Sequence, residues 1–269
     1  MIKRLLLGLL LGVSITASAQ DPQFTQFYAN PMYLNPAFAG SARCPRVAIN
    51  YRNQWPALKK TYITTSASYD QHFDMLNGGV GLMVMNDKAG EGTIATTNIS
   101  GIYAYQLNIN RKLSMRFGLQ GTYVQKKLDW DKLTFGDMID PRYGFVYETQ
   151  EVRPKESRSF MDFSSGMIIY SSKVYGGVAV HHMTQPDEAF IVKGSSKLPM
   201  KITAHVGALL PVGDGAGRGY RGNVNKDEGT FISPNLLYQQ QGSFNQLNRS
   251  EEHTSELQSR QYLVCRLLL

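Results

Sequence analysis

Apolar and polar residues alternate along much of the chain with a period of two. The alternation is most regular in residues 46–55 and 112–126, where apolar side chains such as Ile49 and Leu119 are followed by polar ones. Successive side chains of a β-strand point to opposite faces, so this period predicts strands. The pattern is looser in residues 61–73, 78–85, 93–107, 160–170, 174–182, 200–210 and 230–238. The chain is therefore predicted to be all-β, with about nine strands.

The lengths of these strands and of their connections favour a membrane environment. Several strands reach the roughly nine to eleven residues that a tilted strand needs to cross a bilayer, whereas strands of soluble proteins average about five or six. Outer-membrane barrels alternate short periplasmic turns with longer external loops. Tight turns are expected near residues 74–77, 108–110 and 171–173, and longer connections at residues 56–60, 86–92 and 127–159. This predicts an antiparallel transmembrane β-barrel at residues 45–248.

The first residues have the three parts of a secretory signal peptide. Lys3 and Arg4 form a basic start, residues 5–15 are apolar, and small residues at 17–19 form a cleavage site. The apolar run is too short to cross a bilayer. We expect residues 1–19 to be removed and the mature protein to lie outside the cytoplasm.

Residues 20–44 form a segment that is rich in aromatic residues and proline. Pro22, Pro31 and Pro36 each fix their own φ and disfavour helix at the residue before them, so no long helix is expected. Such an arm has to pack its rings against an already folded surface. It can serve mechanically, by closing one end of a domain, or it can take part in recognition.

Two motifs resemble the PorP/SprF family of outer-membrane proteins. The first consists of residues 23–28, QFTQFY, followed by Asn30-Pro31 and by residues 34–40, LNPAFAG. The second is residues 133–145, LTFGDMIDPRYGF. The resemblance implies a place in the outer membrane and association with the type IX secretion and gliding machinery, in some members together with surface adhesins.

The resemblance also directs attention to residues for partner binding. Ordered aromatic segments offer a large contact area, so both motifs are expected to be interaction surfaces. The expected partners are outer-membrane lipid, other type IX secretion components and a secreted adhesin. The residues concerned are Phe24, Phe27, Tyr28, Asn35, Pro36, Phe38, Phe135, Asp137, Asp140, Pro141 and Tyr143.

Composition and motifs give no support for an enzyme or a nucleic-acid-binding protein. The formal net charge is +7, and the basic residues are spread out instead of forming a stripe. The acidic residues of the 127–159 connection have no spacing typical of a cation site. His181 and His182 are expected to point to opposite faces of one strand and therefore not to share a metal. We predict no catalytic residue, no metal and no cofactor.

Two other functions fit parts of the pattern. An outer-membrane channel for small apolar solutes would use the arm as an internal plug. A soluble periplasmic β-sandwich would accommodate the alternation but not the strand lengths.

The last part of the chain has an unusual sequence. Residues 249–259 read RSEEHTSELQS, which is the translation of a widely used sequencing adapter. We therefore expect residues 249–269 to be artefactual and the natural sequence to depart from this one after Asn248. An odd number of strands agrees with a truncated barrel, because bacterial single-chain barrels have an even number.

Overall fold

The computed structural model describes residues 21–24, 26–42, 44–57, 62–90, 92–151, 153–190, 196–212 and 230–254. The predicted signal peptide, residues 1–19, lies outside these ranges, as do residues 255–269 of the predicted artefactual segment.

Long antiparallel strands form almost all of the described structure. Within the described residues, eleven strands make one sheet, and from β1 to β10 each strand pairs with the next strand of the sheet along the chain. β10 and β11 both pair with one side of β12, and β13 pairs with the other side. The strands are β1 (Arg46–Gln54), β2 (Tyr62–Phe73), β3 (Gly78–Ala89), β4 (Ile94–Asn108), β5 (Ser114–Leu128), β8 (Ser157–Tyr170), β9 (Val174–His181), β10 (Lys201–Ala208), β11 (Leu210–Val212), β12 (Thr230–Gln241) and β13 (Phe244–Thr254).

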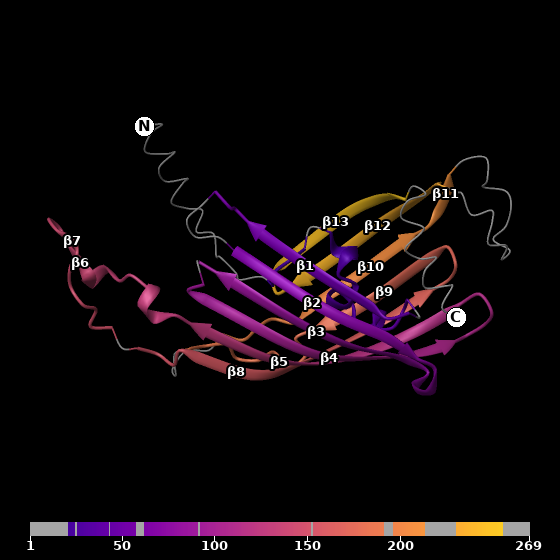
Figure 1. The fold of residues 1–269 in the computed structure, drawn as a ribbon, viewed down its shortest axis with the longest axis horizontal. Helices are drawn as coiled ribbons and strands as arrows, with labels where there is room; N and C mark the ends of the chain where they lie inside the picture. Colours follow the sequence, from indigo (N-terminus) through magenta and orange to yellow (C-terminus); the bar gives the residue numbers. More distant parts are fainter. Residues whose placement is uncertain are drawn as a thin grey trace.

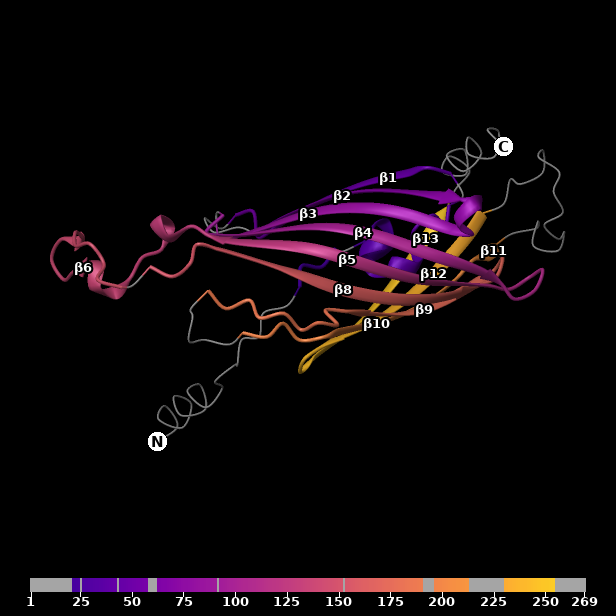
Figure 2. The same ribbon diagram turned by 90° about the horizontal axis from the view of Figure 1, so that it is seen from below.

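The sheet is strongly curved but not closed. Figures 1 and 2 show the strands running obliquely side by side around a concave interior. Among the described residues no pairing joins β1 to β13, so both remain edge strands. The predicted class, an incomplete antiparallel sheet of the β-barrel type, is confirmed. All nine predicted strands are present, whereas β13, which continues past Asn248, was not predicted.

The two faces of the sheet have opposite chemistry. Val84, Ile99, Tyr123 and Met161 are neighbours across four strands and lie exposed on the convex face. The adjacent row on the concave face is buried and mostly polar, with Ser100, Thr122 and Asp162 beside Met83. A sheet that exposes apolar residues on its outer face and buries polar residues on its inner face is typical of a β-barrel protein surrounded by lipid. The alternation in the sequence therefore predicted the faces correctly.

The helical segments are short. The arm contains η1 (Phe27–Ala29), α2 (Pro31–Leu34) and η2 (Pro36–Phe38), and η3 (Asp74–Leu76) forms a tight turn. None of the described helices combines the length and the hydropathy that crossing a bilayer would require.

One connection extends far beyond the sheet. Between β5 and β8 the chain forms η4 (Trp130–Lys132), η5 (Gly136–Met138) and a small hairpin of β6 (Ile139–Asp140) and β7 (Gly144–Phe145). Figures 1 and 2 both show this hairpin projecting past the strand ends. We call this end of the sheet, which also carries residues 182–190 and 196–200, the loop end. The opposite end, with residues 74–77, 109–113 and 171–173, is the turn end.

Candidate functional site

The arm lies inside the concave face of the sheet. Its prolines begin its short helices, because Pro31 and Pro36 occupy the first helical positions where no backbone donor is needed. Asn35 caps the second of these helices, with its side chain accepting a hydrogen bond from the backbone nitrogen of Ala37 at 2.9 Å. Because each helix ends after one turn, the arm forms a compact coil that fits within the curve of the sheet.

Asn35 fixes the middle of the arm to the sheet. Its side chain is fully buried, and its Nδ2 donates to the backbone oxygens of Met167 at 3.2 Å and Val178 at 3.1 Å. The same nitrogen lies 3.1 Å from Nε2 of His205. One amide group therefore connects the arm to β8, β9 and β10.

Glycines make room for the arm on the inner wall. A Cβ added at Gly118 would overlap the backbone of Pro36 and Ala37, and its distance to the Ala37 Cα would be 2.6 Å. A Cβ at Gly79 would lie 2.5 Å from the Cα of Gly40. A Cβ at Gly166 would collide with the side chain of Asn35. Backbone therefore packs directly on backbone along the path of the arm.

A charged cluster holds the arm near the turn end. The Asp70 side chain is almost completely buried and accepts hydrogen bonds from the backbone nitrogen of Gly40 at 2.7 Å and from Arg46 at 2.8 and 2.9 Å. Arg116, which is 2% exposed, donates to the backbone oxygen of Ala39 at 2.8 Å. These charge-assisted bonds satisfy backbone groups that the irregular chain leaves unpaired.

A second charged cluster holds the arm near the loop end. Oδ2 of Asp21 lies 2.9 Å from Nζ of Lys201 and 2.8 Å from Nε2 of His182. The other ring nitrogen of His182 lies 2.7 Å from Oδ2 of Asp162. Tyr33 lies beneath the Lys201 ammonium, 4.9 Å from ring centroid to nitrogen. We call Asp21, Asp162, His182 and Lys201 the latch.

Contacts within the latch shift the pKa values of Asp21 and His182. Burial alone would raise the pKa of Asp21, but Lys201 and His182 hold that pKa well below its usual value. Burial also disfavours the charged form of His182, but hydrogen bonds to Asp162 and Asp21 outweigh it and raise the pKa of His182 to about 9. At neutral pH Asp21 is therefore anionic and His182 cationic.

The two adjacent histidines do not point to opposite faces, so that expectation is wrong. His181 is buried, with Nε2 3.3 Å from the backbone oxygen of Leu34. His182 has a φ of 57°, which ends the strand and turns its ring inward as well. Both rings therefore contact the arm. Among the described residues no three potential ligands gather as they would around a metal ion.

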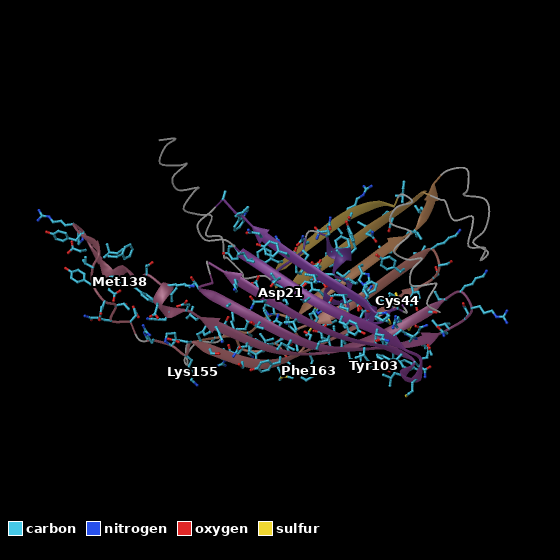
Figure 3. All side chains as sticks on the ribbon, in the orientation of Figure 1. Asp21, Cys44, Tyr103, Met138, Lys155 and Phe163 are labelled. Carbon is cyan, nitrogen blue, oxygen red and sulfur yellow. The ribbon has the colours of Figure 1, made fainter. Side chains whose placement is uncertain are left out.

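The arm crosses the interior from one end of the sheet to the other. Asp21 contacts residues at the loop-end termini of β9 and β10, whereas Gly40 contacts Asp70 near the turn end. Figure 3 shows Asp21 and Cys44, which lie near the two ends of the arm, well apart along the sheet. The start of the arm therefore lies on the same side as the projecting hairpin.

The sequence leads us to expect an outer-membrane protein whose long connections face outward. With that expectation, the path of the arm predicts the labelling of single cysteines on intact cells. Because Gln23 lies near the loop end, a membrane-impermeant maleimide should label Gln23→Cys, as it labels Glu148→Cys, above the level of the unsubstituted chain. Arg111→Cys, in a tight turn, should react only after the outer membrane is permeabilised. If Gln23→Cys also required permeabilisation, the start of the arm would face the other side.

The expected partner-binding aromatics of the arm contact the chain itself. Phe27 packs with Leu34 and Leu237, and Phe38 stacks on the ring of His205 at 5.3 Å. Phe24 and Tyr28 are half-buried and pack edge-to-face on Tyr33 and Phe27, at 5.6 and 5.7 Å. Asn35 and Pro36 are buried. Any effect of these side chains on a partner would therefore act through the position of the arm.

The projecting hairpin is a second, separate surface. Asp140 accepts hydrogen bonds from the backbone nitrogens of Arg142 at 2.7 Å and Tyr143 at 2.9 Å, and from the Tyr147 hydroxyl at 2.9 Å. These bonds, the backbone bond from Arg142 foremost, lower the pKa of Asp140. Asp137 accepts from the backbone nitrogen of Gln150 at 2.8 Å. The acidic residues of this motif therefore fix the loop conformation.

The fixed loop displays aromatic side chains to the surroundings. Tyr143 is 77% exposed, and Phe145, Val146 and Tyr147 are also exposed. Pro141 lies exposed beside them, whereas Phe135 packs on Trp130 at the base, with 4.9 Å between ring centroids. Figure 3 places Met138 beyond the end of the sheet. The structure therefore does not bring the two sequence motifs together.

Sequence reasoning missed the latch and the glycines that receive the arm. Lys201 begins a strand and His182 follows one, and neither position carries a motif. The only available signal was the alternation itself, which places Lys201 and Asp162 on the polar face.

Comparison with known proteins gives one family. The family model described as type IX secretion system membrane protein PorP/SprF matches residues 16–253. No curated protein matches the chain.

Proposed function

The chain belongs to the PorP/SprF family of type IX secretion system membrane proteins, and from this premise we propose that it is a non-enzymatic outer-membrane component that supports the export or surface attachment of an adhesin. The observation that carries the proposal is the combination of an interior filled by the arm with a rigid aromatic hairpin at the loop end. A filled interior suits a scaffold, and an exposed hairpin suits a contact with other proteins.

The docking of the arm argues for a scaffold over an open channel. The arm passes through the interior with backbone-to-backbone contacts at Gly79 and Gly118 and with charged clusters at both ends. A channel for small apolar solutes would require the arm to leave. Its departure would break the contacts of Asp21 with Lys201 and His182 and the bond from Gly40 to Asp70.

The hairpin has the properties of an interaction surface. Exposed Tyr143 and Phe145 are large, have few rotatable bonds, and are held by a loop that Asp137 and Asp140 stabilise. Aromatic residues in preorganised positions carry much of the binding energy in protein interfaces. We propose that Phe135, Asp137, Asp140, Pro141 and Tyr143 form or support the contact with a secretion partner or adhesin, and that the arm residues Phe24, Phe27, Tyr28, Asn35, Pro36 and Phe38 support it indirectly.

The test is co-purification of secretion partners with hairpin variants. The double variant Tyr143→Ser and Phe145→Ser should reduce recovery of the partner at least tenfold, while the unfolding temperature of the protein stays unchanged because both side chains are exposed. Met75→Ser is the matched control, since Met75 is 92% exposed in a turn at the opposite end. It should leave recovery unchanged.

Two outcomes separate the alternatives. Undiminished recovery with the double variant would remove the hairpin from the interface. Substituting Phe24, Phe27 and Tyr28 by alanine should release the arm. If that variant gained uptake of apolar solutes in liposomes and kept its partner, a channel would become the better description.

A further inference from the structure

A cavity remains between the arm and the inner wall of the sheet, on the loop-end side. It has a volume of about 160 Å³ and is bounded by Asp21 and Tyr33 of the arm and by the inner faces of β3, β4, β5 and β8. The proposed function makes no use of it. The lining residues of β3, β4, β5 and β8 lie in rows. Each row consists of inward-facing residues that are neighbours on adjacent strands, and the rows are described in order from the loop end.

The row nearest the loop end carries an unbalanced negative charge. Asp87, Thr96 and Lys126 are neighbours across β3, β4 and β5. Lys126 is paired with Glu188 at 2.8 Å, whereas Asp87 accepts a hydrogen bond only from the Thr64 hydroxyl and forms no ion pair with any described residue. The other three carboxylates of the lining, Asp21, Asp162 and Glu188, each lie within 2.9 Å of a nitrogen of Lys201, His182 or Lys126. Asp87 is thus the one carboxylate among these described lining residues that has no cationic partner.

Deeper rows offer apolar contacts and unpaired acceptors. Met85 and Val124 are buried and flank Asn98 in the next row. Asn98 Oδ1 has no hydrogen-bond partner among the described residues, and neither has Oε1 of Gln120, whose side chain is over nine-tenths buried. A buried acceptor without a donor is unfavourable, and a bound donor would remove this cost.

The spacing of these acceptors indicates the shape of the missing donor. Consecutive inward-facing residues of one strand are separated by about 7 Å. Asp87 and Asn98 lie in successive rows, and Gln120 lies two rows beyond Asn98. Acceptors at these intervals, with the methionine and valine side chains beside Asn98, match nitrogen donors joined by methylene chains. Aliphatic stems of cationic side chains pack well on apolar surfaces while their charged ends find polar partners.

We propose that this cavity binds a linear alkyl chain with an ammonium group, which is either a free polyamine or a lysine side chain of a bound peptide. The ammonium pairs with Asp87, and the chain extends along Met85 and Val124. In a polyamine, the further nitrogens reach Asn98 Oδ1 and Gln120 Oε1.

Calorimetric titration of the full-length protein in detergent micelles tests this proposal. The probes are spermidine, a tripeptide acetyl-Gly-Lys-Gly-amide, and 1,8-octanediol as a neutral chain. We expect saturable binding of at least one ammonium probe and none of the diol. Tighter binding of spermidine would assign a free polyamine, and tighter binding of the tripeptide would assign a peptide lysine.

Variants locate the binding in the cavity. Asp87→Asn preserves the shape of the side chain but removes its charge. It should reduce the affinity for the ammonium probe at least fivefold. Gln120→Met removes the deeper acceptor and should reduce the affinity for spermidine. Asp74→Asn, at a fully exposed carboxylate of a distant turn, should change nothing. Equal binding of the diol, no binding of either ammonium probe, or undiminished binding by Asp87→Asn would each overturn the proposal.

Discussion

Replacing Gly118 by valine should expel the arm from the interior of the sheet. A Cβ at this position would overlap the backbone of Pro36 and Ala37, which cannot move aside as a flexible side chain could. Overpacking alone costs about 1–3 kcal/mol. Here the arm would also lose the bonds of Asn35 to β8 and β9. We expect the arm to become sensitive to added protease within residues 20–44 and the unfolding temperature to fall by several degrees.

Gly101→Val is the matched control for this prediction. Gly101 lies on the neighbouring strand β4, and a Cβ there would meet nothing within 4 Å. The same change of residue type therefore tests β-propensity without a collision, and we expect the arm to remain protected. Protection of the arm in Gly118→Val as well would mean that it does not lie against β5 as described.

The strands and their faces could be predicted because strand formation depends on local alternation. Ile49 and Leu119 point outward and their polar neighbours point inward, as the period of two requires. β13 was missed because residues 244–254 are polar and alternate poorly. These residues form a strand because they pair with β12. Pairing with another strand cannot be predicted from the local alternation of apolar and polar residues.

The arm shows where sequence reasoning stops. Its prolines correctly predicted that it forms no long helix. Its aromatic residues correctly predicted that it packs on a folded surface. Which surface it contacts depends on Gly79, Gly118 and Gly166, which lie far along the chain and read as ordinary glycines within strands. The hairpin was expected as a loop, but the bonds of Asp137 and Asp140 that shape it bridge several residues without a recognisable motif.

Replacing Asp21 by asparagine should release the start of the arm. Asp21 is the shared partner of Lys201 and His182, and the Lys201 side chain is only 5% exposed. Removing one member of a buried ion pair leaves the other without compensation and costs about 3–5 kcal/mol. We expect faster hydrogen exchange in residues 21–34 of Asp21→Asn, with unchanged exchange near Asp70. Asp74→Asn, at an exposed carboxylate, should match the unsubstituted protein in both regions.

The same latch predicts a dependence of arm docking on pH. His182 has its pKa raised to about 9, so its contribution is complete below its unfolded pKa of about 6.5 and is lost as the pH rises through about 9. Asp21 has a lowered pKa, so its contribution is present above about pH 4 and is lost only in stronger acid. The arm should therefore be held most firmly between about pH 4 and 6.5 and be loosened as the pH rises through about 9. The loosening comes from the contacts of His182 with Asp21, because Asp162 lies on β8 and stays beside His182 when the arm leaves.

Measuring protease sensitivity of the arm from pH 6 to pH 10 tests this profile. The unsubstituted protein should become sensitive with a midpoint near pH 9, whereas His182→Gln should be more sensitive at neutral pH and lose the alkaline step. The ring of His182 bridges Asp21 and Asp162, so a neutral side chain there leaves both carboxylates with less positive charge. An alkaline step that persisted in His182→Gln would show that another group controls the release.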